Sequence, residues 1–206
     1  MSFTIIGLTG PTGAGKTTVL HVLEGMGAAV LDCDAIYHQL LSTDDRLLSQ
    51  IDVRFPGTVE NGVLQRKKLG NLVFSDPSAL EDLNKITHSA VVSQVRRSLK
   101  SKPSLAAIDA IALFESGLDQ LCDITVAVTA PTEDRVQRLM ARDGISQDYA
   151  RRRIAAQREE SWFREKCSYV LTNDGSPAQF RDKCLAFLQQ LGIIGEEIIP
   201  KGEIDL

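Results

Sequence analysis

The sequence predicts an α/β fold in which helices cover both faces of a parallel sheet. Short apolar segments alternate with segments of helical periodicity along its 206 residues, the order expected of successive β-α units. The apolar segments are continuous rather than alternating with polar residues, as in strands that are buried on both faces of a sheet. A glycine-rich turn directly follows the first of them. These observations favour one α/β domain over residues 1–206, with helical additions.

Five segments are expected to form the sheet, and helices connect them. The strands are expected at Phe3–Thr9, Ala28–Leu31, Leu105–Ile111, Ile124–Thr129 and Tyr169–Leu171. A helix is expected at about Lys16–Gly25, because its apolar residues recur at helical spacing. Another begins after Pro131, with Glu133 and Asp134 in its first turn and arginines toward its end, a charge order that the helix dipole favours.

Two stretches do not fit this alternation. Residues 43–102 contain helical patterns such as Leu64–Phe74 and Ala79–Lys100 but no convincing strand, which predicts a helical insertion. Residues 143–166 are polar and arginine-rich, with apolar residues too sparse to anchor them in the core, which predicts a mobile helical lid. The core is then expected at about 1–42, 103–142 and 167–195, followed by a loosely held tail at 196–206.

The turn from Gly10 to Thr17 has the spacing G-x-x-x-x-G-K-[ST], which predicts a phosphate-binding P-loop and with it the P-loop NTPase fold. Its glycines allow backbone N–H groups to converge on phosphate oxygens, and the following helix adds its positive end. The motif implies that Lys16 reaches the β- and γ-phosphates and that the Thr17 hydroxyl binds Mg²⁺. The alternative is a glycine-rich turn with a solvated lysine, and Lys16 is expected to face solvent when no nucleotide is bound. The expected contacts of this loop with a nucleoside triphosphate are Gly10, Gly13, Ala14, Gly15, Lys16, Thr17 and Thr18.

Composition excludes several other classes. The formal net charge of −4 provides no basic field for nucleic acid or an anionic membrane, and no apolar stretch is long enough to span a bilayer. No basic segment precedes the first apolar run, so a signal peptide is not expected. Four scattered cysteines without a C-x-x-C pair favour reduced thiols over a zinc site. We therefore expect a cytoplasmic protein without nucleic-acid or membrane partners.

Three features favour a small-molecule kinase over a P-loop switch, motor or transporter. The chain is short and lacks the Asn-Lys-x-Asp run that reads guanine in GTPases. The insertion and the lid suit an enzyme that encloses two substrates and excludes water, because phosphoryl transfer depends on positioning and electrostatics. Carboxylates follow the strand ends, where doubly wound sheets bind ligands.

These carboxylates each have two interpretations. Asp32 and Asp34 follow the second strand: one of them can cap the next helix, while Asp34 can orient the acceptor hydroxyl or accept its proton. Asp109, near the end of the third strand, can hold Mg²⁺ directly or through water, or it can be a capping residue. Glu115 can orient the substrate or begin the short helix that follows.

Arginines are concentrated in residues 131–166. Acidic residues are interleaved with them, so most are expected on solvated helix faces with i,i+4 acidic partners. Two or three are expected to touch phosphate, where a guanidinium pairs with oxygens and stabilises charge in the transition state. Arg138 and Arg142, one helical turn apart, are the best candidates.

The ordered motifs over about residues 4–180 resemble those of the dephospho-CoA kinases, which phosphorylate the ribose 3′-hydroxyl of dephospho-CoA in the last step of coenzyme A synthesis. The segments that carry the resemblance are Ile6–Gly10, Lys16–Thr18, Leu31–Asp34, Asn61–Arg66, Phe74, His88, Leu113–Glu115, Arg138–Gly144, Arg153–Gln157 and Asn173–Gly175. Beyond the P-loop no single segment is specific, but their order is.

The resemblance implies ATP as phosphoryl donor, dephospho-CoA as acceptor and Mg²⁺ as cofactor, with an insertion that binds the acceptor. It implies that Asp34 is the catalytic carboxylate and that Asn173 lies by the adenine pocket. His88 is either an acceptor contact or a helix-face histidine with a local hydrogen bond. The expected catalytic residues are Lys16, Asp34 and Arg142; the further ATP contacts are Arg138 and Asn173; the acceptor contacts are Asp34, Arg66, His88 and Glu115. We expect a monomer or a weak homo-oligomer.

The sequence departs from this family's pattern at several positions. Ser89 stands where proline is usual, Ile111-Ala112 where Pro-Leu is usual, and Arg135 where glutamine is frequent, while Pro11 removes one amide donor from the P-loop. Two of these changes border the acceptor side. Two alternatives therefore stay open: a kinase for another nucleotide or small alcohol, and a non-catalytic nucleotide-dependent switch.

Overall fold

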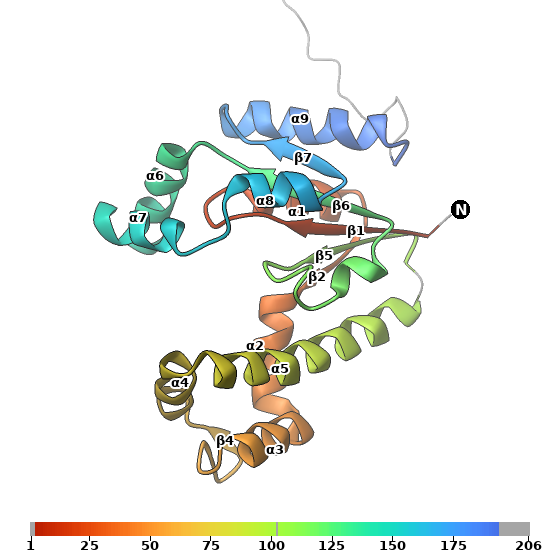
Figure 1. Cartoon of the computed structure of the whole chain (residues 1–206). Helices are drawn as coiled ribbons and strands as arrows, with labels where there is room; N and C mark the ends of the chain where they lie inside the picture. Colours follow the sequence, from red (N-terminus) through yellow and green to blue (C-terminus); the bar gives the residue numbers. More distant parts are fainter. Residues whose placement is uncertain (1–2, 102, 194–206) are drawn as a thin grey trace, which may run out of the picture. The chain divides into compact units, whose positions relative to one another are not determined.

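The computed structural model describes residues 3–101 and 103–193, and it confirms the α/β fold (Figure 1). The chain forms two compact units. The first unit comprises Met1–Gly7 and Ala29–Asp123, and the second comprises Leu8–Ala28 and Ile124–Leu206. The predicted tail at 196–206 lies outside the described residues.

The five expected strands form one sheet in the order β2-β5-β1-β6-β7. Their bounds are β1 Thr4–Thr9, β2 Ala29–Asp32, β5 Leu105–Asp109, β6 Ile124–Thr129 and β7 Tyr169–Thr172. Strands β2 and β5 pair in parallel with Asp32 opposite Asp109, and β6 and β7 pair in parallel with Thr129 opposite Thr172. Strand β5 ends two residues before the predicted Ile111, because the chain enters a series of turns after Ala110.

In the first unit, the long helix α5 packs against three shorter helices (Figure 1). The helices are α2 Cys33–Thr43, α3 Asp45–Arg54, α4 Arg66–Ser75 and α5 Pro77–Ser98, with short 3₁₀ helices at Leu99–Ser101 and Leu118–Leu121. Asp32, Asp44 and Asp76 occupy the N-caps of α2, α3 and α5, and each carboxylate accepts a backbone N–H of the first turn. One apolar core joins these helices to β2 and β5.

The prediction that residues 43–102 contain no strand is wrong at one place. Strands β3 (Val59–Glu60) and β4 (Val63–Leu64) form a two-stranded antiparallel hairpin. Its turn residues Asn61 and Gly62 have φ of 52° and 74°. Asn-Gly is the preferred pair for such a turn, because both positions require positive φ. The sequence signal for this hairpin is therefore its turn, because its strands are too short to show a pattern.

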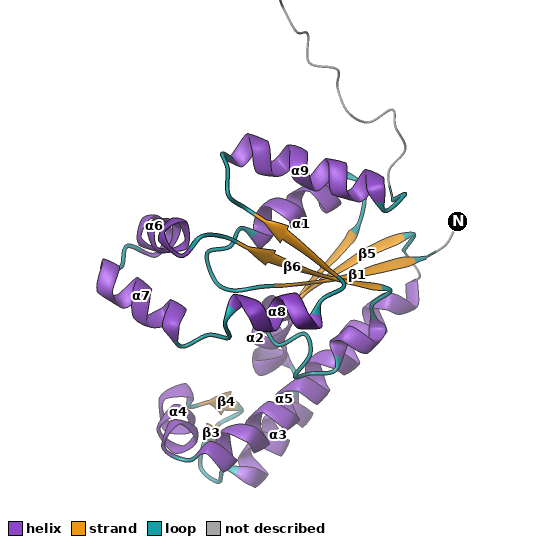
Figure 2. Ribbon diagram, turned by 45° about the horizontal axis from the view of Figure 1, so that its top comes forward, coloured by secondary structure: helices purple, strands orange, loops and turns teal. Residues whose placement is uncertain are grey.

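In the second unit, helices α1 and α9 pack against each other, and α6 packs against α7 (Figure 2). The helices are α1 Lys16–Gly25, α6 Thr132–Asp143, α7 Gln147–Ala155, α8 Glu160–Lys166 and α9 Pro177–Gln190. Helix α9 begins with a capping box in which Ser176 and Gln179 satisfy each other's backbone N–H groups. Val19 and Leu23 of α1 and Phe180 of α9 are buried.

The helices of the expected lid, residues 143–166, are anchored by more apolar contact than the sequence suggested. Ala150 of α7 is fully buried in a cluster with Val136 and Leu139 of α6. Phe163 of α8 is only 3% exposed. The expectation that apolar residues here are too sparse to reach a core is therefore wrong.

Within residues 3–101 and 103–193, no helix has the length and apolar character needed to cross a membrane.

Candidate active site

The P-loop lies in the second unit, and its backbone conformation requires glycine. Gly10, Gly13 and Gly15 all have positive φ, of 132°, 76° and 104°. A Cβ at Gly10 would lie 2.1 Å from the carbonyl oxygen of Val128. Helix α1 begins directly after Gly15 and has no side-chain cap. Among the described residues, the N–H groups of Gly13, Gly15 and Thr17 make no recorded hydrogen bond. They are therefore available to an anion at the helix N-terminus.

Lys16 already reaches across this loop. Its Nζ donates a hydrogen bond to the carbonyl oxygen of Gly10 at 3.0 Å, and the residue is half-buried. The expectation of a solvent-facing Lys16 is therefore not met. The ammonium group thus binds the carbonyl of the first P-loop glycine, and a phosphate oxygen is a stronger partner for it than a neutral carbonyl.

Two of the expected ATP contacts donate hydrogen bonds to carbonyl oxygens of the P-loop. Asn173, only 6% exposed, donates from Nδ2 to the carbonyl oxygen of Ala14 at 2.9 Å. Arg138 donates from Nη1 to the carbonyl oxygens of Gly13 and Ala14 at 3.2 and 3.3 Å. A Cβ at Gly15 would lie 2.3 Å from Asn173 Nδ2, so the loop and this amide fit each other only with glycine at 15.

Arg142, by contrast, forms an ion pair with an acid on its own helix. Its Nε and Nη2 donate to the two carboxylate oxygens of Asp143 at 2.7 and 3.1 Å, and Arg153 also pairs with Asp143. The two guanidinium groups lower the pKa of the Asp143 carboxyl to about 2. Arg151 and Arg164 pair with Glu133 and Glu160. These four arginines have acidic partners as expected, but of the four pairs one, Arg164 with Glu160, has the expected i,i+4 spacing.

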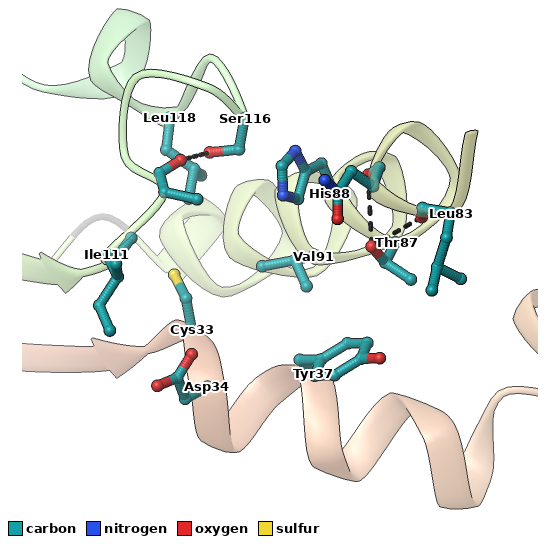
Figure 3. Close-up of a pocket in the computed structure, with 13 residues that line it drawn as sticks. Cys33, Asp34, Tyr37, Leu83, Thr87, His88, Val91, Ile111, Ser116 and Leu118 are labelled. Atoms are coloured by element: carbon teal, nitrogen blue, oxygen red, sulfur yellow. Dashed lines mark hydrogen bonds between the residues drawn. The ribbon is translucent and has the colours of Figure 1, made fainter. Parts of the chain in front are cut away.

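A pocket of about 220 Å³ lies in the first unit (Figure 3). Asp34 and Tyr37 line it from α2, and Thr87 and His88 line it from α5. Its apolar wall is formed by Cys33, Leu83, Val91, Ala110, Ile111, Ala112 and Leu118. Figure 3 shows Asp34, Cys33 and Ile111 at the same end of the view, and all three line this pocket. A largely apolar pocket with a few polar groups is the usual form of a small-molecule site.

The structure separates the roles of Asp32 and Asp34. Asp32 is the N-cap of α2, and its Oδ1 accepts the N–H of Ala35 at 2.9 Å. Asp34 lies in the first turn and lines the pocket. Burial, followed by the negative charges of Asp109, Asp32 and Asp34, raises the pKa of the Cys33 thiol to about 12. Cys33 therefore remains a neutral thiol beside an acidic strand end.

The other expected acceptor residues lie around the same part of the first unit. Burial lowers the pKa of His88, opposed by the charge and backbone of Glu115, so His88 is a neutral imidazole facing Glu115 at neutral pH. The charge of Arg66 acts on the Tyr37 hydroxyl, whose pKa burial raises. Glu115 does not begin a helix, because the 3₁₀ helix starts at Leu118.

The departures from the family pattern do not all fall in this pocket. Ile111 and Ala112 line it, whereas Ser89 lines a separate groove between α3 and α5. Sequence reasoning missed Tyr37 and Thr87, which carry no motif and become pocket residues only because α2 and α5 pack together.

The residues present fit a magnesium ion that is held mainly by phosphates. No described group of three or more His, Cys, Asp or Glu side chains can hold a metal ion. Mg²⁺ does not need such a cage, because it keeps several waters and takes few protein oxygens besides those of the substrate phosphates. Thr17 offers an exposed hydroxyl at the P-loop that makes no hydrogen bond to any residue in 3–101 or 103–193.

The fold and the lysine-bearing glycine loop define a P-loop kinase. The model of the family described as dephospho-CoA kinase matches residues 4–179. The chain belongs to this family.

Individual relatives agree with the family match. A dephospho-CoA kinase of Syntrophotalea carbinolica is 35% identical over 193 residues, which cover 91% of this chain and 92% of the relative. A crystal structure from Thermus thermophilus superposes with a TM-score of 0.78 at 33% identity, covering 95% of this chain and all of the other. A shikimate kinase of Acinetobacter baumannii, with a TM-score of 0.52 and 20% identity, shares the fold.

Proposed function

We propose that this protein transfers the γ-phosphoryl group of ATP to the ribose 3′-hydroxyl of dephospho-CoA, giving coenzyme A and ADP. The observation that carries the proposal is the family match over residues 4–179. The matched residues include both the P-loop and the pocket of the first unit that Asp34 lines. Each half of the proposed chemistry thus has its own group of residues in the chain.

The P-loop binds and orients the triphosphate. The N–H groups of Gly13, Gly15 and Thr17 donate to phosphate oxygens, and Lys16 exchanges the Gly10 carbonyl for the β- and γ-phosphates. Arg138 and Asn173 stabilise the loop conformation through hydrogen bonds to its carbonyl oxygens, and they form part of the ATP site. Gly10, Ala14 and Thr18 are the remaining proposed ATP contacts of this loop, of which Gly10 and Ala14 are buried without nucleotide.

Asp34 accepts the proton of the acceptor hydroxyl. The ribose oxygen forms the new bond to the γ-phosphorus while the bond from that phosphorus to the β,γ-bridging oxygen breaks, and ADP leaves. The proton of the 3′-hydroxyl passes to the Asp34 carboxylate, a step that contributes about 10²- to 10⁴-fold in rate. Arg142 leaves Asp143 to stabilise negative charge on the transferred group.

The pocket of the first unit holds the acceptor. Its apolar wall and the neutral His88 suit an uncharged part of dephospho-CoA, while Arg66 supplies a positive charge for its phosphates. Glu115 orients His88 through its charge and its backbone, both of which act on the imidazole.

Mg²⁺ is the expected cofactor, with the Thr17 hydroxyl as its protein ligand and Asp109 as a ligand directly or through water. When bound, it neutralises charge on the β- and γ-phosphates. We further propose a cytoplasmic protein that acts as a monomer or weak homo-oligomer, with no nucleic-acid or membrane partner.

The test is ADP formation with Mg²⁺ and ATP, compared among dephospho-CoA, nucleoside monophosphates, small alcohols and no acceptor. The proposal predicts ADP only with dephospho-CoA, together with a product heavier by one phosphate. ADP formation with a different acceptor would replace the substrate and point to Ile111 and Ala112 as the cause, because both line the pocket. ATP binding without turnover on any acceptor would indicate a switch.

A further inference from the structure

The peptide of Thr12, at the entrance of the P-loop, is held on both sides by side chains from far along the chain. Its N–H donates to Oε1 of Gln157 at 2.9 Å. Its carbonyl oxygen accepts Nε–H of Arg135, also at 2.9 Å. Arg135 closes the group by donating from Nη2 to the same Oε1 of Gln157 at 3.2 Å. We call these three residues the Thr12 latch.

The latch holds a part of the loop that has little support of its own. Pro11 has no N–H, and the one backbone hydrogen bond that the structure records within residues 10–14 runs from Ala14 N–H to the Pro11 carbonyl at 3.3 Å. Gly13, which follows Thr12, has φ of 76°, and a Cβ at Gly13 would lie 3.0 Å from the Arg135 carbonyl oxygen. The Gly13 N–H belongs to the same planar peptide group as the Thr12 carbonyl. The direction in which the Gly13 N–H points therefore depends on how the Thr12 carbonyl is held.

Arg135 is a buried residue that makes directed hydrogen bonds, rather than a surface charge. It is only 7% exposed, and burial lowers its pKa although Glu160 opposes this effect. A guanidinium that is buried needs hydrogen bonds in fixed directions, and its planar fork provides them to Thr12 and Gln157 together. Gln157 directly follows Ala156, the C-cap of α7, so the latch also connects the P-loop to the helices of residues 143–166.

We propose that Arg135 and Gln157 are positioning residues for ATP: they hold the Thr12 peptide so that the P-loop amides converge on phosphate. This inference rests on the proposed function only in taking ATP as the ligand, and it does not depend on the acceptor. The role of Gln157 is that of an acceptor, since its Oε1 takes two N–H groups and its Nε2 makes no hydrogen bond that the structure records among the described residues.

The test compares two substitutions of Gln157. Gln157→Leu keeps the size but removes the acceptor, and losing two hydrogen bonds is expected to weaken MgATP binding about tenfold. Gln157→Glu keeps an oxygen for both donors, so its MgATP affinity should stay within about threefold of the parent. Arg151→Gln is the matched control, because it changes an exposed α7 arginine that pairs with Glu133 outside the latch. Affinity is measured by calorimetry without acceptor, and thermal unfolding of the nucleotide-free variants shows whether each is folded.

The two Gln157 variants separate positioning from packing. Equal weakening by Gln157→Leu and Gln157→Glu, or no weakening by Gln157→Leu, would overturn the proposal. Equal weakening by Arg151→Gln would also overturn it, since the effect would then be general to α7. If Gln157→Leu does not fold, Arg135→Lys carries the same test, because it keeps the charge but removes the Nε donor to Thr12.

The result is distinguishable from failure of the proposed function. MgATP affinity is measured without dephospho-CoA, so a different acceptor would leave the latch result unchanged. In steady-state assays with the true acceptor, Gln157→Leu should raise the KM for ATP more than it lowers kcat, and the KM for the acceptor should remain as in the parent.

Discussion

A methyl group added at Gly15 probes how closely the P-loop and Asn173 are fitted. Gly15 has φ of 104°, and its new Cβ would lie 2.3 Å from Asn173 Nδ2. That amide would have to move, and its hydrogen bond to the Ala14 carbonyl, 2.9 Å long, would be lost. The Ala14 carbonyl would keep Arg138 Nη1 as a donor at 3.3 Å. Gly15→Ala therefore combines a backbone effect with the displacement of one side chain.

The two contributions can be estimated separately. Placing a residue other than glycine in this backbone conformation costs about 1–3 kcal/mol of unfolding free energy. Losing the Asn173 hydrogen bond costs about 1 kcal/mol, since its acceptor keeps a second donor. Gly15→Ala alone should thus cost about 2–4 kcal/mol. In an Asn173→Ala background the side-chain contribution is already absent, and the same change should cost about 1 kcal/mol less.

The assay is urea unfolding of the parent, both single variants and the double variant, with free energies compared in a cycle. The structure predicts a double variant that is about 1 kcal/mol more stable than the sum of the two single effects implies. Strict additivity would refute the reasoning, because it would mean that Gly15 and Asn173 do not constrain each other. A Gly15→Ala variant as stable as the parent would refute it more directly.

Three further substitutions test individual roles. Lys16→Ala should abolish turnover while the variant remains folded, because the hydrogen bond from Lys16 Nζ to the Gly10 carbonyl joins two residues of the same loop; retained turnover would refute its role. Asp34→Asn should lower kcat about 10²- to 10⁴-fold with little change in ATP affinity, and equal changes in both would show a structural or metal-linked role instead. Burial lowers the pKa of His88 below its ordinary 6.5, so the unfolded chain binds its proton better and unfolding free energy falls as pH drops below 6.5. His88→Gln should reduce that loss in unfolding curves at pH 7 and pH 5.5, and an unchanged loss would contradict this origin.

The features predicted from the sequence are those encoded by local pattern. The P-loop spacing and the continuous apolar segments predicted the sheet, and α1 runs over the residues expected, Lys16–Gly25. The hairpin of β3 and β4 was missed because two-residue strands have no periodicity, although Asn61-Gly62 is a hairpin signal.

The site was predictable where a motif marks it and not where packing creates it. The choice between Asp32 and Asp34 could not be made from their spacing, since it depends on α2 beginning at Cys33 rather than one residue later. Gln157 lies 145 residues from Thr12, and nothing local in the sequence connects them. Their contact depends on the tertiary structure, in which α7 packs against α6 through the buried residues Val136 and Ala150.

The most direct test of the account is the structure of the product formed from dephospho-CoA and MgATP, determined by NMR after ADP release is complete. The account predicts one new phosphate monoester on the ribose 3′-oxygen and one ADP for each acceptor consumed. A phosphate at another hydroxyl, or ADP formed without a phosphorylated acceptor, would contradict it.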